Sequence, residues 1–363
     1  MEIKPIYQIE DWEQRIKRQD AFWECEIIDR PVVSIIIEEP SIKAKLPKSF
    51  HKTLRDRWCD PEFQAQTAVE QVKKTQYLGD ALPVKFPDLG PDFFASCFNL
   101  QSEIKFVEDT SHLKPFVDDF STLEKIIQFS ESNPWYKIME DLYSAFFELG
   151  NGLFYTGLPD IHPGADCMVG FRGPDKFSMD LYDYPSEIQR SITYITDSFL
   201  DLFEKYYQKI KAEREPCTGW AQIVSTKRWH VPSCDFSFMI SSKMFEQFFL
   251  EGIIREINNF EASIFHVDGP GVLRHLDLLL EIKQLSAIQW IYGAGNGRAS
   301  DWIEVYKKVQ SAGKALQLID VEPDEIPMLI DNLKPEGLWL MMKNVPDKAA
   351  SGQILSSVSH WKK

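Results

Sequence analysis

The last third of the chain carries the most regular pattern of apolar and polar positions. Short apolar runs the length of one strand alternate there with longer stretches whose apolar residues recur at helical spacing. Strands that alternate with helices in this way are typical of a parallel sheet. We predict strands at residues 262–266, 287–291, 315–319 and 337–342, and helices at residues 270–282, 300–311 and 323–333.

The preceding two thirds show the same alternation less regularly. Residues 9–23 have apolar positions at helical spacing among charges, and residues 185–213 predict a long amphipathic helix. Residues 32–37 form an apolar run rich in β-branched residues, which predicts a strand buried on both faces. Residues 153–156 and 220–224 predict two further strands.

Together these elements predict an α/β protein built as a closed (β/α)8 TIM barrel. No Gly-x-Gly-x-x-Gly sequence opens an early helix, so the pattern does not favour a dinucleotide-binding fold. We expect residues 1–30 to form an N-terminal helical extension and residues 31–363 to form a single barrel domain, elaborated in the region 41–120. A barrel of this kind carries its active site at the carboxyl ends of its strands.

The composition narrows the classes of function. The chain has 363 residues, of which 44% are hydrophobic and 26% are charged, which is ordinary for a globular protein. Its formal net charge of -15 makes nucleic acid and anionic membrane surfaces poor partners. The six cysteines are scattered without a Cys-x-x-Cys pair, and no apolar leader begins the chain. We therefore expect a cytoplasmic protein that acts on a small molecule.

The strongest chemical pattern is His266-Val267-Asp268, at the end of a predicted strand. Alternation along a strand places His266 and Asp268 on one side, with α-carbons about 7 Å apart. An imidazole and a carboxylate on one face can bind a metal or act as an acid–base pair. The alternative is that Asp268 caps the next helix and His266 is a hydrogen-bonded core residue. The position at a strand's carboxyl end favours the catalytic interpretation.

Other candidates lie at the ends of predicted elements. Asp160 and His162 repeat the spacing of an acid and a histidine, although a turn held by local hydrogen bonds explains them equally well. Asp235 is a candidate catalytic acid, whereas the adjacent Cys234 is expected to be a small buried side chain. Glu322 is a candidate third ligand for a metal held by the strand-end histidine and aspartate. It also precedes a proline, where an acid stabilises a helix N-terminus.

Aromatic residues and a glycine loop are candidates for binding a substrate. Trp229, Trp290 and Tyr292 are predicted to line the pocket, with Trp290 and Tyr292 on one face of the same strand. Aromatic residues at strand positions are more often core, which is our interpretation of Trp339. Residues 293–297 contain three glycines that let the backbone approach a ligand, but such a loop without lysine is more often a tight connection.

Five segments spread over residues 26–340 form a recognisable set: Glu26-Ile27-Ile28-Asp29-Arg30-Pro31-Val32, Gly170-Phe171-Arg172-Gly173, Asp180-Leu181-Tyr182-Asp183-Tyr184-Pro185, Met239-Ile240-Ser241-Ser242-Lys243-Met244-Phe245 and His266-Val267-Asp268-Gly269. As a pattern they resemble the uroporphyrinogen decarboxylase superfamily, which also contains zinc-dependent corrinoid methyltransferases acting on methanol and methylamines. The resemblance implies a TIM barrel, a divalent metal such as zinc, and a corrinoid supplied by a partner protein.

Two departures from the family pattern bear on the chemistry. The decarboxylases hold propionate carboxylates with an arginine-rich strand end, whereas residues 36–40 read Ile-Ile-Glu-Glu-Pro here and would repel such a substrate. The methyltransferases hold zinc with His-x-Cys and a later Cys. Here His266 matches, Asp268 replaces the cysteine, and no cysteine follows Cys234. A His/Asp set is harder than a thiolate set and is less suited to activating a thiol.

Three functions are compatible with these patterns. The leading hypothesis is a methyltransferase that moves a methyl group from a small methylated substrate to a corrinoid protein, with His266, Asp268 and Glu322 holding a metal. The rival is a metal-independent decarboxylase or lyase acting on a small acid or sugar, in which Asp268 or Asp235 protonates an intermediate. The third is a barrel that only binds a ligand. Metal content discriminates between the first two, and thermal stabilisation by a ligand without turnover would support the third.

Overall fold

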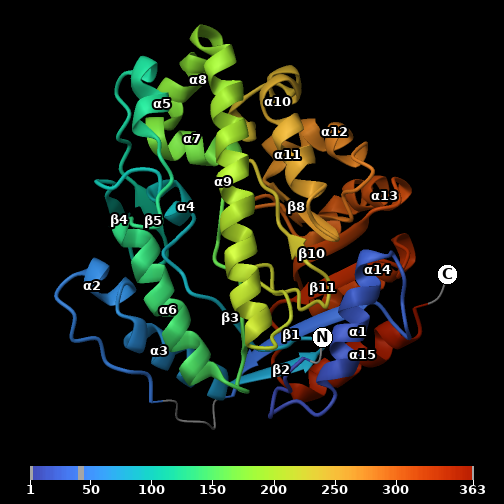
Figure 1. Cartoon of the computed structure of the whole chain (residues 1–363). Coiled ribbons are helices and arrows are strands. Elements are labelled where there is room, and N and C mark those ends of the chain that lie inside the picture. Colours follow the sequence, from blue (N-terminus) through green and yellow to red (C-terminus); the bar gives the residue numbers. More distant parts are fainter. Residues whose placement is uncertain (1–2, 40–44, 362–363) are drawn as a thin grey trace.

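The computed structural model describes residues 3–39 and 45–361 and shows a central sheet surrounded by helices (Figure 1). Seven strands form the sheet in the order β2-β1-β11-β10-β9-β8-β7. Neighbouring strands are parallel except β1 and β2, which are antiparallel. The bounds are β1 Val32–Glu38, β2 Thr75–Gly79, β7 Trp229–His230, β8 Ala262–Asp268, β9 Ala287–Ile291, β10 Ala315–Val321 and β11 Leu338–Met342.

Four shorter strands form two separate pairs. β3 (Val84–Lys85) runs parallel to β6 (Tyr155–Thr156), and β4 (Ile104–Phe106) runs antiparallel to β5 (Ser111–Leu113). Within the part of the chain that the structure describes, no ladder joins β7 to β6 or β2 to β3. The ladders therefore give an open sheet and not the closed barrel that the sequence predicts. The strands β3, β6 and β7 are each two residues long, so they offer few backbone groups for closure.

Helices make up most of the remaining structure. The α-helices are α1 Trp12–Trp23, α2 Leu54–Trp58, α3 Pro61–Lys73, α4 Phe93–Ser96, α5 Leu123–Ile126, α6 Pro134–Gly150, α7 Gly164–Arg172, α8 Pro174–Asp183, α9 Pro185–Ala212, α10 Ser242–Phe248, α11 Leu250–Ile257, α12 Leu276–Leu280, α13 Ile303–Ser311, α14 Ile326–Asn332 and α15 Lys348–Ser359. The 3-10 helices are η1 Phe120–Thr122, η2 Asp235–Met239, η3 Pro270–His275, η4 Ala299–Trp302 and η5 Pro323–Glu325. The long helix α9 lies between the group α2–α7 and the group α10–α15 (Figure 1).

The predicted elements of the last third are confirmed almost residue by residue. β9 has the predicted bounds, and β8 and β10 each continue two residues beyond the predicted end. The helices predicted at 270–282, 300–311 and 323–333 each begin as a 3-10 turn before the α-helix. Strands and helices therefore alternate along the chain as the apolar periodicity indicates.

Two predictions about strands are wrong. Residues 220–224 do not form a strand, because Gln222 has a positive φ of 58° and the backbone there bonds to side chains. The N–H of Val224 donates to Gln19 Oε1 at 2.6 Å. In addition, β1 is not buried on both faces throughout, since Ile36 is 42% exposed near its end. Residue 40, the last of the segment 36–40 that departs from the decarboxylase pattern, lies outside the described residues.

Helix α1 packs against the amino-terminal ends of the strands. The ring of Phe22 meets Trp339 of β11 edge-on at 5.4 Å, and the ring of Trp23 lies 5.5 Å from Trp229 of β7. Gln19 Nε2 donates to the carbonyl oxygen of Asp80 at 2.7 Å. The apolar face of α1 thus covers this end of the sheet, and the carboxyl ends of the strands lie on the other side.

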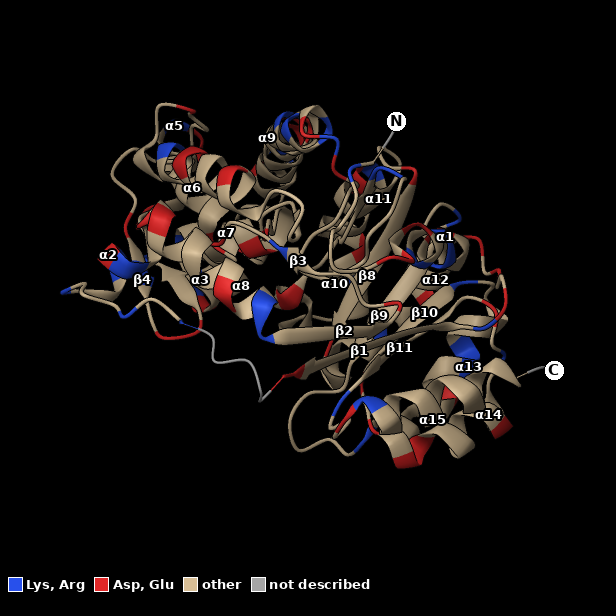
Figure 2. Cartoon of the chain, turned by 90° about the horizontal axis from the view of Figure 1, so that it is seen from below, with Lys and Arg blue, Asp and Glu red and all other residues tan. Residues whose placement is uncertain are grey.

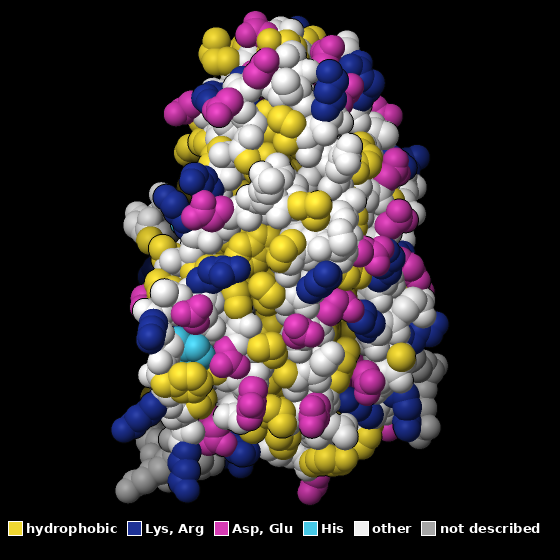
Figure 3. Space-filling view, turned by 60° about the vertical axis from the view of Figure 1, so that its left-hand side comes forward, with side chains coloured by type: hydrophobic (Ala, Val, Ile, Leu, Met, Phe, Trp, Pro, Cys, Tyr) yellow, Lys and Arg dark blue, Asp and Glu magenta, His cyan; other side chains and the backbone are white. Residues whose placement is uncertain are grey.

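The surface carries charges of both signs. Acidic and basic residues are interspersed along the outer helices (Figure 2). On the face that comes forward when the left-hand side of Figure 1 is turned to the viewer, apolar side chains lie in small groups separated by charged ones (Figure 3). Among the described helices, none is long and apolar enough to span a membrane.

Candidate functional site

The candidate site lies at the carboxyl ends of β7 and β8, away from α1. His266 and Asp268 lie on one face of β8 at its carboxyl end, and Asp235 opens η2 a few residues after β7. Asp160 and His162 lie in the irregular segment between β6 and α7. Three segments that are far apart in the sequence therefore bring five of the predicted residues to one region.

The donor atoms of Asp235, His266 and Asp268 all lie within 4.8 Å of one another. A second group with the same spacing contains His162, Asp166 and Asp235. Asp235 belongs to both groups, so the two groups form one continuous cluster of carboxylates and imidazoles. Metal ligands and acid–base groups both require this kind of proximity.

A chain of hydrogen bonds fixes the protonation of the His266 ring. Gln317 Nε2 donates to the carbonyl oxygen of Ala221 at 3.2 Å, which leaves Gln317 Oε1 to accept from Gln289 Nε2 at 2.6 Å. Gln289 Oε1 must then accept, and its partner at 2.5 Å is Nδ1 of His266. A neutral His266 therefore carries its proton on Nδ1 and has a lone pair on Nε2. Such a second contact is what orients a metal-binding histidine.

The surroundings of His266 favour its neutral form. Burial lowers the pKa of His266 and outweighs the opposing effects of the Gln289 hydrogen bond and of the Asp268 charge. The ring of Trp220 meets the His266 ring edge-on, with centroids 5.1 Å apart. His266 is thus prepared to offer a lone pair near neutral pH, as a ligand or as a base.

His162 has the opposite electrostatic environment. Its Nε2 lies 2.9 Å from Asp160 Oδ1, its Nδ1 lies 3.0 Å from Ser233 Oγ, and Asp166 is 3.9 Å away. Burial works against a charged ring, but the carboxylates of Asp160 and Asp166 outweigh it and hold the pKa of His162 well above its ordinary value. In the metal-free protein, His162 is therefore a cation among acids.

Asp235 is held at the centre of the cluster by Asp166. The two oxygens of Asp166 accept the backbone N–H groups of Asp235 and Phe236, each at 3.0 Å, and so fix the start of η2. The crowding of protein atoms around the Asp235 carboxyl and the charge of Asp166 raise the pKa of Asp235 to about 7, although the side chain remains accessible to solvent. A cation placed among these carboxylates would relieve this repulsion.

A cavity of about 260 Å³ opens beside the cluster. Asp160, His162 and His266 line it together with Trp220, Asp88 and Phe86. Asp88 Oδ1 accepts the N–H of Gly90 at 2.6 Å, but burial raises the pKa of Asp88 to about 6, with a smaller contribution from Asp160. The cavity is large enough for a small molecule and has acidic and aromatic walls.

Three residues of this region, Asp88, Asp166 and Trp220, are not among those predicted from the sequence. Asp88 follows β3, and the rule that selects polar residues after strands would have found it if that two-residue strand had been located. Asp166 lies in the first turn of α7, where an acid is usually explained by the helix dipole. Trp220 lies in the segment that was predicted as a strand.

Glu322 and Tyr292 lie outside the cluster. Glu322 accepts from Arg298 Nη2 at 2.9 Å and from Asn344 Nδ2 at 2.8 Å, and its backbone forms a capping box with Glu325. It therefore does not complete the metal set with His266 and Asp268. Both Glu322 and Tyr292 line a different cavity, of about 410 Å³, together with the glycine loop 293–297.

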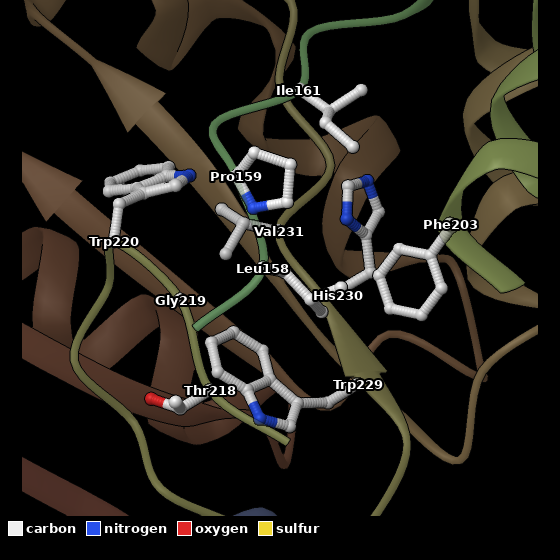
Figure 4. Close-up of a pocket in the computed structure, with 10 residues that line it drawn as sticks. All are labelled: Leu158, Pro159, Ile161, Phe203, Thr218, Gly219, Trp220, Trp229, His230 and Val231. Carbon is white, nitrogen blue, oxygen red and sulfur yellow. The ribbon is translucent and has the colours of Figure 1, made fainter. Parts of the chain in front are cut away.

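The predicted tryptophans do not line the cavity beside His266. Trp290 is fully buried, and its ring packs against Trp302 at 5.0 Å on the other face of β9. Trp229 is buried and lines a separate cavity of about 20 Å³, the volume of one water molecule (Figure 4). His230 and Trp220 line the same small cavity, and Trp220 also lines the cavity beside His266. Trp339 is core, as its sequence pattern indicates.

Comparisons with known proteins show the fold. No protein-family model matches the sequence, and no curated protein matches it significantly. Among solved structures, a methyltransferase from Methanosarcina mazei matches with a TM-score of 0.57 and 11% sequence identity. The match covers 95% of this chain and 98% of that chain. This chain therefore shares its fold, over nearly the whole length, with a structure described as a methyltransferase.

Proposed function

We propose that this chain is a methyltransferase-type enzyme that acts on a small methylated substrate in the cavity beside His266. The observation that carries the proposal is the convergence of Asp235, His266 and Asp268 at the carboxyl ends of β7 and β8, with the Nδ1 of His266 held by Gln289. The likeness of the fold to a methyltransferase supports the same class. The resemblance in sequence suggests that a corrinoid protein receives the methyl group.

The three side chains of this group fit a divalent metal ion. Two carboxylates balance its charge, and a neutral imidazole held by Gln289 supplies the third donor. When bound, a metal such as zinc acts as a Lewis acid towards the heteroatom that carries the methyl group. Because carboxylates are harder donors than thiolates, this set favours oxygen or nitrogen over sulfur as that heteroatom.

Asp88 is the proposed proton donor. When the methyl group leaves, the electron pair of the broken bond stays on the heteroatom, which then takes up a proton. Asp88 faces the cavity, and its pKa of about 6 lets the carboxyl hold a proton close to neutral pH. Trp220 and Phe86, on the wall of the same cavity, limit the access of water to the reacting atoms.

We also propose that the open sheet and the pair β3–β6 are two arcs of one (β/α)8 barrel. Eight parallel strands are available for it, namely β1, β3 and β6 to β11. The N–H of Leu158 donates to the carbonyl oxygen of Thr218 at 2.8 Å, which links the end of β6 to the segment before β7. A barrel would explain why all predicted site residues that converge do so at carboxyl ends of strands.

A metal-independent decarboxylase or lyase is the second candidate. The observation in its favour is that Asp88 and Asp235 have pKa values raised to about 6 and about 7. Such carboxyls can protonate a carbanion-like intermediate without a metal. The two candidates differ in whether activity requires a metal ion.

The test measures metal content and activity together. Purified protein is assayed for methyl transfer to reduced cobalamin, with methanol and methylamines as substrates, and for release of carbon dioxide from small acids. We expect His266→Gln and Asp268→Asn to lose methyl transfer and the zinc held by this three-residue group, while His360→Gln, a change at the exposed histidine that follows α15, retains both.

Two results would refute the proposal. One is full methyl transfer by protein that has been stripped of metal and shown to be metal-free. The other is metal-independent release of carbon dioxide that depends on Asp88, which would establish the second candidate. Thermal unfolding of each variant separates loss of a ligand from loss of the fold.

A further inference from the structure

The second group of donors, His162, Asp166 and Asp235, lies outside the three-residue site described above except for the shared Asp235. Its members come from the segment after β6, from the first turn of α7 and from η2. Their donor atoms lie within 4.8 Å of one another, the same limit that holds for the first group. The carboxylate of Asp235, which has two oxygens, is therefore common to both groups of donors.

Each histidine uses one ring nitrogen for a contact with a residue outside its own group of donors. His266 uses Nδ1 to contact Gln289, which leaves no described partner on Nε2. His162 uses Nε2 to contact the Asp160 carboxylate at 2.9 Å, and its Nδ1 points towards Ser233 and Asp166. A carboxylate behind a histidine is the usual second contact of a metal-binding imidazole.

The charge of the cluster is unbalanced. Asp160, Asp166, Asp235 and Asp268 are carboxylates, and among the described residues no lysine or arginine forms an ion pair with any of them. Two divalent ions carry the charge that balances four carboxylates.

We propose that the site binds two divalent metal ions that share the carboxylate of Asp235. One is held by His266 and Asp268 and the other by His162 and Asp166. This inference rests on the metal site of the proposed function and extends it from a mononuclear to a binuclear centre. A shared carboxylate lets one ion polarise the substrate while the other holds a second oxygen ligand nearby.

The test is a titration of metal-free full-length protein with Mn²⁺. Equilibrium dialysis gives the number of ions bound, and electron paramagnetic resonance detects the magnetic coupling of two Mn²⁺ ions joined by one carboxylate. We expect two equivalents and a coupled spectrum in the unaltered protein. We expect one equivalent and an uncoupled spectrum in both His162→Gln and His266→Gln, while His360→Gln matches the unaltered protein.

The outcomes separate this inference from the proposed function. One equivalent in the unaltered protein, lost in His266→Gln and kept in His162→Gln, would overturn the binuclear centre and leave the mononuclear site standing. No bound ion at all would overturn both. Because Asp166 also holds the start of η2, Asp166→Asn serves as the second variant, and it must agree with His162→Gln in the number of ions bound.

Discussion

Replacing Gln289 with leucine removes the link that fixes the ring of His266. Gln289 is 2% exposed, and leucine is close to it in volume, so the backbone of β9 should not move. The change deletes two hydrogen bonds, of 2.5 Å to His266 Nδ1 and of 2.6 Å to Gln317 Oε1. The ring can then rotate or carry its proton on Nε2, where it would block a metal.

The expected magnitude follows from those contacts. Loss of a second contact to a metal-binding histidine typically lowers metal affinity by about 10–100-fold, which is about 1.4–2.8 kcal/mol. Leaving the buried oxygen of Gln317 without a donor should also lower the free energy of unfolding by about 1–3 kcal/mol. Both effects are measurable and distinct, because one concerns ion binding and the other concerns folding.

Calorimetric titration with Zn²⁺ in a His162→Gln background measures the affinity of the His266 site alone. Side-chain ¹⁵N spectra of the metal-free protein report whether Nδ1 or Nε2 carries the proton. Gln19→Leu is the matched control, since it removes another fully buried glutamine, one that bonds to the backbone of Asp80 and Val224 and does not belong to this chain of amides. Equal affinity in Gln289→Leu and the unaltered protein, or an equal loss in the control, would refute the role assigned to this chain of amides.

Three further predictions concern stability and the wall of the cavity. Asp80→Asn should lower the free energy of unfolding, measured with urea, by about 3–5 kcal/mol, because Asp80 is fully buried against a pair of arginines. Asp29→Asn is the control and should cost under about 1 kcal/mol, because Asp29 is exposed. Burial raises the pKa of Glu215 from its ordinary 4.5 to about 7, so between pH 4.5 and pH 7 the folded state binds more protons than the unfolded state. The free energy of unfolding therefore falls as the pH rises through this range, by up to about 1.4 kcal/mol per pH unit. Glu215→Gln should remove this dependence on pH, and an unchanged dependence would contradict the assignment. Trp220→Ala should move the pKa of His266 upwards towards its ordinary value in an NMR titration of metal-free protein, since burial is the main cause of its depression; a pKa that stays low would show that other residues bury the ring.

The sequence predicts β8 to β11 well because each is a short apolar run between helices of clear period. It fails at residues 220–224 for a specific reason. Ile223 and Val224 are adjacent and both fully buried, which alone suits a buried strand, but their segment turns at Gln222 and bonds to Gln19. Gln19 is about 200 positions away in the sequence, so no local pattern can show this partner.

The role of Glu322 could not be decided from the spacing of apolar residues along the chain. The sequence allows either a metal ligand or an acid at a helix start, and the structure places Glu322 at the start of η5 with Arg298 and Asn344 as its partners. Arg298 lies in the loop after β9, and its ion pairs with this carboxylate depend on how two neighbouring loops fold together. The deciding contact is thus tertiary, and the local rule for helix starts was the better guide.

The two acid–histidine pairs show why one spacing can give two chemistries. Asp160 and His162 lie in an irregular segment, so the carboxylate can bend back and contact the ring directly at 2.9 Å. His266 and Asp268 lie on a strand, which keeps their α-carbons apart and aims both side chains at Asp235. The first histidine is therefore charged by its own neighbour, while the second remains neutral and relies on Gln289 for its orientation. The backbone around each pair therefore decides whether the carboxylate can reach its own histidine directly.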